Sequence, residues 1–216
     1  MKRFFIIDKF NTWHDWHLTL TAKDLTDPEP KTNYITLDGV SGTLDVTEAL
    51  TGEVEFNDRT VTASFMCSEG THKDREALYR TITAALHGKK VKLVEPDDPD
   101  HFFLGRIKIK APGKHPAYMA FTVEAVCDPW RYAIHETERV VPVSGAADVI
   151  LRNNGRRTVC PVINVTGAVS IVCNGVTTSL TDGSYKITDI RLRQGVNVIG
   201  VSGEGSVTFV YREAEL

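Results

Sequence analysis

The pattern of hydrophobic and polar positions predicts one helix in a chain that otherwise consists of strands. From Thr71 to His87 the apolar residues recur at helical spacing and form a single stripe: Leu78, Ile82, Ala85 and Leu86, with Tyr79 beside them. Thr71 is a favourable N-cap with Asp74 as a weak capping-box partner, and Gly88 supplies the left-handed position after the last turn. The sequence therefore predicts a helix over 71–87.

Short apolar segments bounded by turn residues predict strands on both sides of this helix. In the first part of the chain they cover 1–8, 34–37, 42–47, 53–56, 61–65, 91–94, 102–109 and 117–125. Trp16, Leu18 and Leu20 alternate and are expected on one face of a further strand, with Trp13 in the turn before it. These segments predict a sheet that carries the helix on one face.

The pattern changes after a joint predicted at 134–142, because no helical periodicity follows it. Asn174-Gly175 between apolar segments is the strongest hairpin signal, since this pair suits both central positions of a type I′ turn. Regular short strands predict a β-sandwich or jelly roll. We therefore expect a mainly β protein with one α-helix, divided into an N-terminal domain at 1–138 and a C-terminal β-sandwich at 139–216.

Composition excludes several classes of protein. The 216 residues include 42% apolar and 25% charged residues, which suits a globular chain with a real core. The net charge is −3 and no cluster of Lys and Arg is present, so sequence-specific or electrostatic binding of nucleic acid is not expected. No apolar segment approaches the roughly 20 residues that span a bilayer, and membrane insertion is not expected either. The first eight residues end their short apolar segment in Asp8, which favours an opening strand over a signal peptide.

The sequence contains no motif that indicates a catalytic residue, a cofactor site or a set of metal ligands. His14 and His17 would need a third protein ligand to hold zinc. The acidic segment 95–101 has four carboxylates and a histidine, but it lacks the spacing of a calcium loop and favours a hairpin turn. No phosphate-binding, dinucleotide-binding or nucleophile-elbow motif occurs. The four cysteines lie far apart in apolar segments and are expected to be buried thiols, so we expect a protein without enzyme activity.

The polar, proline-bearing segment 24–33 is expected to leave the sheet, because its prolines cannot continue a ladder of backbone hydrogen bonds. It is the first candidate for contact with a neighbouring subunit. The residues expected at such an oligomer interface are Asp24, Asp27, Pro28, Glu29, Pro30 and Lys31.

Several short motifs recur in an order and spacing that resemble the distal tail (Dit) proteins of long, non-contractile-tailed bacteriophages. The likeness covers most of the chain and includes the segments 12–18, 42–47, 160–163, 195–199 and 207–212. One departure is that Arg59 follows Asn57-Asp58, where such proteins tend to have Asn-Arg directly. The positions expected to have structural roles on this basis are Trp16, Asp38, Gly39, Arg59, His87, Gly88, Gly105, Arg106, Asp128 and Pro129.

The resemblance implies a structural component of the phage tail tip, assembled in the host cytoplasm and carried in the virion. It implies a hexameric ring with a channel for DNA, made by the N-terminal domains, and galectin-like C-terminal domains. The implied partners are the tail-tube protein, the tail-associated hub protein and the tape-measure protein.

Three alternatives stay open from the sequence: a receptor- or glycan-binding module, a tail-tube subunit, and, more remotely, a hydrolase. Phe209 and Tyr211 alternate with Val207 and are expected in the core, which counts against glycan binding.

Overall fold

The computed structural model describes residues 4–113 and 115–216 and divides the chain into two compact units. Residues 1–3 of the predicted opening strand lie outside the described part. The first unit is Met1–Pro129 with Leu216, and the second is Trp130–Glu215. The structure thus divides the chain after Pro129, whereas the sequence pattern placed the boundary after residue 138.

The first unit is built on an antiparallel sheet with the strand order β2-β1-β7-β8-β9-β6-β3. Its strands are β1 (Ile6–Ile7), β2 (Phe10–Asn11), β3 (Thr19–Leu25), β6 (Arg59–Cys67), β7 (Lys90–Glu95), β8 (Asp98–Ile109) and β9 (Met119–Ala133). Burial alternates strictly along β6, since one face of the strand packs against the core. The strand predicted at 53–56 is wrong: only Phe56 forms an isolated bridge, because this part of the chain belongs to a protruding segment.

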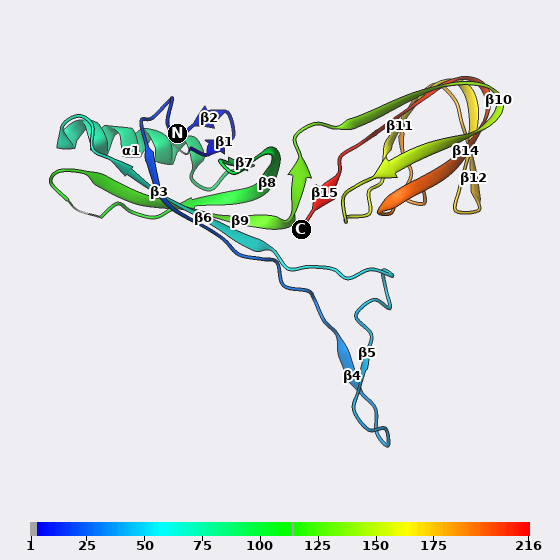
Figure 1. Cartoon of the computed structure of the whole chain (residues 1–216), viewed down its shortest axis with the longest axis horizontal. Helices are drawn as coiled ribbons and strands as arrows, with labels where there is room; N and C mark the ends of the chain where they lie inside the picture. The colour runs from blue at the N-terminus through cyan, green and yellow to red at the C-terminus, as the bar shows by residue number, and fades with distance from the viewer. Residues whose placement is uncertain (1–3, 114) are drawn as a thin grey trace. The chain divides into compact units, whose positions relative to one another are not determined.

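The helix α1 (His72–Leu86) lies against the sheet of the first unit (Figure 1). Thr71 and Asp74 form a complete capping box, and Gly88 has a φ of 78°, so the predicted helix and both of its ends are confirmed. Ile82 and Leu86 are fully buried in the core with strand residues such as Phe65 and Phe121.

One buried residue of α1 is charged and does not belong to the apolar stripe. Arg75 is 6% exposed, and its guanidinium donates hydrogen bonds to the main-chain oxygens of Gly70 at 2.6 Å and Pro116 at 2.7 Å. A cation becomes tolerable at a buried position when such acceptors replace water. Arg75 therefore ties the start of the helix to the segment before β9.

The segment before β3 also differs from its prediction. Trp16 is buried and stacks on Phe10 with ring centroids 4.7 Å apart, but it lies in a turn and not on a strand. The chain takes a φ of 51° at His17, and β3 begins only at Thr19. Trp16 and Leu18 are thus both buried, as their alternation predicted, but a compact turn rather than a strand directs them into the core.

The second unit contains a five-stranded antiparallel sheet with the order β10-β14-β11-β12, and β13 pairs with β11. Its strands are β10 (Thr137–Asn153), β11 (Val162–Cys173), β12 (Val176–Leu180), β13 (Gly183–Lys186) and β14 (Gly195–Tyr211). The predicted hairpin is confirmed: Asn174 and Gly175 both have positive φ, and Cys173 pairs with Val176. The short β15 (Ala214–Glu215) pairs with the end of β9 within the same unit.

The sandwich of the second unit forms because its three longest strands bend at one level. We call the four glycines at this level the glycine crease: Gly145, Gly167, Gly203 and Gly205. A Cβ built on Gly205 would lie 1.9 Å from the main-chain oxygen of Thr166, and one on Gly203 would lie 2.2 Å from that of Ala168. Because no side chain fits at Gly203 or Gly205, β14 and β11 approach each other closely at this level.

Both halves of the bent sheet contribute to a single core. Val165, Val207 and Phe209 come from one side of the glycine crease, and Ile171 and Ile199 come from the other. Phe209 is fully buried and Tyr211 is 5% exposed, as the alternation predicted. The fold class expected from the sequence, mainly β with one helix and a C-terminal sandwich, is therefore confirmed.

Candidate assembly surface

The most prominent surface feature of the first unit is a protruding segment, residues 26–58, which we call the arm. It begins where β3 ends and returns to the sheet at β6. Its outer part is a hairpin of β4 (Tyr34–Thr36) and β5 (Thr43–Asp45), which form a sheet of their own. Figure 1 shows this hairpin beyond the ends of β3 and β6, away from the sheet that carries α1.

The arm exposes large apolar side chains that ordinarily lie in a core. Leu50 is 96% exposed and Val40 is 62% exposed, and Tyr34, Ile35, Leu37 and Leu44 are also exposed. An isolated two-stranded hairpin is at best marginally stable in water, and large exposed apolar side chains concentrated on one segment are typical of interaction sites. A second surface laid against the arm would remove these side chains from water.

The arm is also strongly acidic. Residues 26–58 contain a single lysine, Lys31, against eight carboxylates: Asp27, Glu29, Asp38, Asp45, Glu48, Glu53, Glu55 and Asp58. This concentration of negative charge exceeds that of the chain as a whole, whose net charge is −3. A surface complementary to the arm would carry cations as well as apolar side chains.

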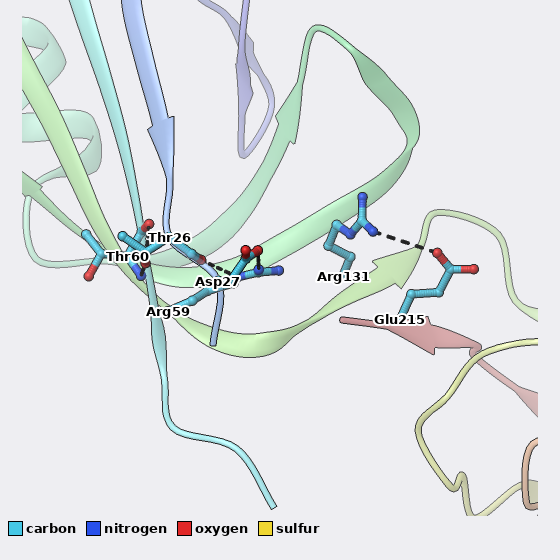
Figure 2. Close-up of polar contacts among 6 residues, drawn as sticks. All are labelled: Thr26, Asp27, Arg59, Thr60, Arg131 and Glu215. Carbon is cyan, nitrogen blue, oxygen red and sulfur yellow. Dashed lines mark hydrogen bonds and ion pairs between the residues drawn. The ribbon is translucent and has the colours of Figure 1, made fainter. Parts of the chain in front are cut away.

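The root of the arm is held by specific hydrogen bonds (Figure 2). Thr26 and Thr60 face each other: the Thr60 amide donates to the Thr26 hydroxyl oxygen at 2.8 Å, and the Thr26 amide donates to the Thr60 main-chain oxygen at 3.1 Å. Beside them, the Arg59 guanidinium donates to the main-chain oxygen of Thr26 at 3.0 Å and lies 3.4 Å from an Asp27 carboxylate oxygen. These contacts join the two legs of the arm where they leave the sheet.

The interface residues predicted from the sequence occupy the outgoing leg of the arm and the strand before it. Asp24 still belongs to β3 and pairs with Thr62, so the expectation that the ladder stops at this residue is wrong. The other predicted residues lie beyond the root, on a leg paired to the return leg by hydrogen bonds from Lys31 to Glu55 and from Asn57 to Glu29, both 2.8 Å long. The five that belong to this leg are Asp27, Pro28, Glu29, Pro30 and Lys31.

The sequence pattern missed the larger part of this surface. The alternating residues 34–37 and 42–47 predicted strands, and β4 and β5 do form there, but as a separate hairpin with both faces exposed. The sequence signal that could have revealed an exposed hairpin was the acidic charge that accompanies this alternation. A strand packed in the main sheet would not carry so many carboxylates.

Several motif positions make contacts at the C-terminal end of α1. The His87 ring nitrogen Nδ1 accepts a hydrogen bond from the Ile109 amide at 3.1 Å, and the Arg106 guanidinium donates to the Gly88 main-chain oxygen at 2.6 Å. These contacts fasten the end of α1 to β8.

The remaining motif positions are divided between the sheet of the first unit and the arm. Gly105 lies under Cys127, since a Cβ there would be 2.3 Å from the Cys127 sulfur. Asp128 accepts a hydrogen bond from the Lys90 ammonium at 2.9 Å, and Pro129 ends the first unit. Asp38 and Gly39 lie in the turn of the arm hairpin, where Gly39 has a φ of 82°.

The potentially reactive side chains have structural surroundings. Burial and the nearby Asp128 raise the pKa of the Cys127 thiol to about 12, which keeps it protonated. The four cysteines are free, with Cys67, Cys127 and Cys173 buried and Cys160 half-buried. Within residues 4–113 and 115–216, no group of three metal-ligating side chains is present, and no helix is both long and apolar enough to cross a bilayer.

The second unit is joined at its ends by polar contacts. Arg131 near the end of β9 lies 3.9 Å from Glu215 on β15, as Figure 2 shows. Asn154 donates to the Glu213 carboxylate from both its main-chain and side-chain nitrogen atoms, each at 3.1 Å. These contacts close the end of the sandwich at which the chain enters and leaves.

Comparison with solved structures finds the same fold in a bacteriophage adsorption-hub protein. The crystal structure of the SPP1 Dit protein (gp 19.1) aligns with a TM-score of 0.71, and the alignment covers 98% of this chain and 99% of that chain. That protein is described as a paradigm of the hub adsorption apparatus in phages that infect Gram-positive bacteria. The sequence identity is 14%, so the likeness establishes the fold. No protein-family model and no curated protein sequence matches the chain.

Proposed function

We propose that this chain is a structural component of a bacteriophage tail tip, a distal tail protein that assembles with copies of itself. The observation that carries this proposal is the likeness of fold to the SPP1 Dit protein over 98% of the chain. The absence of a catalytic motif in the sequence agrees with a structural role, and we propose no enzyme activity. The protein is then a part of the virion, assembled in the host cytoplasm.

In finer detail, we propose a hexameric ring that joins the tail tube to the hub and host-adhesion proteins below it. DNA passes through the central channel of this ring without being read. The partners along the tail axis are the tail-tube protein, the tail-associated hub protein and the tape-measure protein.

The arm supports self-assembly on physical grounds. Its exposed apolar side chains, such as Leu50 and Val40, gain free energy when they leave water, and a hairpin without a supporting third strand gains order when it docks. A contact in which the arm of one copy meets a different surface of the next is heterologous, and heterologous contacts close into rings when the rotation between copies allows it.

The proposal is tested by the mass of the full chain in solution, measured by light scattering after size exclusion and followed by negative-stain imaging. We expect ring views and a mass near six times the 24.0 kDa of one chain. Rings that stack into long tubes would instead identify a tail-tube subunit. A monomer at every concentration would contradict self-assembly.

The contribution of the arm is tested by shortening it without disturbing its root. Residues 34–45 are replaced by an Asn-Gly turn, which leaves the hydrogen bond from the Val46 amide to Asn33 close to the new turn. We expect a folded chain, with the melting temperature of the parent, that no longer forms the ring. A shortened chain that forms the same ring would show that the hairpin 34–45 is not the assembly contact.

A further inference from the structure

A band of cations lies on the first unit, on the exposed face of β7 and β8. Outward-facing positions alternate with buried ones along both strands, and every outward position from Lys90 to Lys92 and from Arg106 to Lys110 carries a positive charge. We call these residues the cationic band: Lys90, Lys92, Arg106, Lys108 and Lys110.

The band is only partly neutralised within its own chain. Lys90 pairs with Asp128 at 2.9 Å and Lys110 pairs with Glu124 at 2.5 Å. Lys92, Arg106 and Lys108 make no ion pair within 4 Å in the described part of the chain. Lys108 nevertheless adds to the effect of Lys110, whose hydrogen bond lowers the pKa of the Glu124 carboxyl. Lys92 instead lies over the Phe102 ring at 4.6 Å, and Arg106 donates to a main-chain oxygen.

The register of the sheet brings like charges together. Lys90 and Arg106 are direct cross-strand partners, and a like-charge pair at such a position is destabilising in an isolated sheet. Next to them, Val126 on β9 is 51% exposed, and its main-chain oxygen lies close to Gly105. The surface thus combines partly neutralised positive charge with an exposed apolar side chain, and both features are complementary to the arm.

We propose that the cationic band is the docking surface for the acidic arm of a neighbouring copy. This inference rests on the proposed self-assembly and deepens it by naming the surface that receives the arm. The arm carries eight carboxylates and one lysine, and the band carries five cations, of which two are already paired with carboxylates. Charge complementarity of this kind selects the partner surface and accelerates encounter, while the apolar side chains of the arm supply affinity.

The test exchanges the charges of the two surfaces in the full chain. The band variant is Lys92→Glu with Lys108→Glu, two exposed residues without ion pairs. The arm variant is Asp38→Lys with Glu48→Lys and Glu55→Lys. The control variant changes two exposed cations outside the band, Lys73→Glu with Lys186→Glu, and so matches the charge change of the band variant.

We expect both the band and arm variants to need a protein concentration at least about tenfold higher than the wild type for assembly, as measured by light scattering. The control variant assembles like the wild type. An equimolar mixture of the band and arm variants is expected to assemble at a lower concentration than either variant alone. Half of the contacts in the mixture can join an unaltered acidic arm to an unaltered cationic band, and in the other half three new lysines meet two new glutamates. Wild-type assembly weakens between about 0.1 M and about 0.5 M salt.

Three outcomes would overturn the docking of arm on band. A band variant that assembles like the wild type removes the band from the contact, and a mixture that assembles no better than either variant alone removes the pairing of these two surfaces. Binding of duplex DNA by the wild type that is lost in the band variant, with assembly unchanged, would assign the band to nucleic acid. A wild-type chain that never assembles would instead overturn self-assembly itself, so the two failures are distinguishable.

Discussion

The guanidinium of Arg59 donates a hydrogen bond to the main-chain oxygen of Thr26 at 3.0 Å, from a side chain that is only 4% exposed. Arg59 is the first residue of β6, and Thr26 follows directly after β3, so this bond joins the two strands where the arm leaves them. The same guanidinium lies over the Phe103 ring at 5.3 Å. A single buried cation therefore anchors the arm to both the sheet edge and the core.

Replacement of Arg59 by Ala is expected to lower the free energy of unfolding by about 2–3 kcal/mol, because a buried hydrogen bond from a charged donor is lost. The measurement is urea denaturation of the full chain. Asp27→Ala is the matched comparison, since the Asp27 side chain is fully exposed and its ion pair with Arg59 is 3.4 Å long. That change is expected to cost less than about 1 kcal/mol. Equal losses in the two variants would contradict the buried-anchor role of Arg59.

Gly205→Ala is expected to destabilise the second unit by more than about 3 kcal/mol, because the new methyl group would overlap the Thr166 main-chain oxygen at a φ of 140°. Gly145→Ala is the control: Gly145 belongs to the same glycine crease and has a φ of 83°, but nothing lies within 4 Å of its Cβ position. It should cost only the roughly 1–2 kcal/mol of a left-handed backbone. Thermal denaturation followed by circular dichroism separates the two cases, and similar losses would argue against steric closure of the crease.

The helix cap predicts a dependence of stability on pH. Hydrogen bonds from the Thr71 side chain and main chain hold the pKa of Asp74 below its usual value. The ionised carboxylate therefore stabilises the fold above the unfolded-state pKa of about 3.9, and this contribution is lost as the pH falls through the lower pKa of the folded state.

Thr71→Ala tests this cap. We expect the variant to lose about 1 kcal/mol of stability near neutral pH. The carboxyl pKa of Asp74, followed by NMR titration, is expected to rise toward its usual value at the same time. An unchanged pKa would show that the capping box does not hold the carboxylate.

The two thiols Cys127 and Cys160 are expected to react at different rates. Burial raises the pKa of both, and that of Cys127 reaches about 12. Because the thiolate is the reactive form, an alkylating reagent at about pH 8 should modify the half-buried Cys160 first and leave Cys127 unmodified until the chain unfolds. Mass spectrometry of labelled peptides with and without urea gives the order. Early modification of Cys127 would contradict its burial against Gly105.

Local patterns predicted the elements whose signals are local. The helix limits follow from Thr71, Asp74 and Gly88, and the hairpin at Asn174-Gly175 follows from the φ values that those two residues favour. The burial of Phe209 and Tyr211 follows from alternation along one strand. Each of these features depends on residues within a few positions of one another.

The features that the patterns missed depend on contacts between distant parts of the chain. Arg75 is polar, and its burial depends on Pro116, which lies far along the sequence. Alternation along 34–37 predicts a strand equally well in a body or in an arm, because it does not reveal whether a third strand or a helix covers the apolar face. The arm as a whole is recognised only when the exposure of Leu44 and Leu50 is combined with the charge of residues 26–58.

The glycine crease also has a consequence for how the second unit unfolds. β10, β11 and β14 each pass through the bend, so both layers of the sandwich share the same hydrogen-bonded strands. Because the strands are continuous through the bend, separation or a change of register in one layer also disturbs the hydrogen bonds of the other layer. The unit should therefore open as one cooperative block, with amide protons on both sides of Gly203 exchanging at a common slow rate.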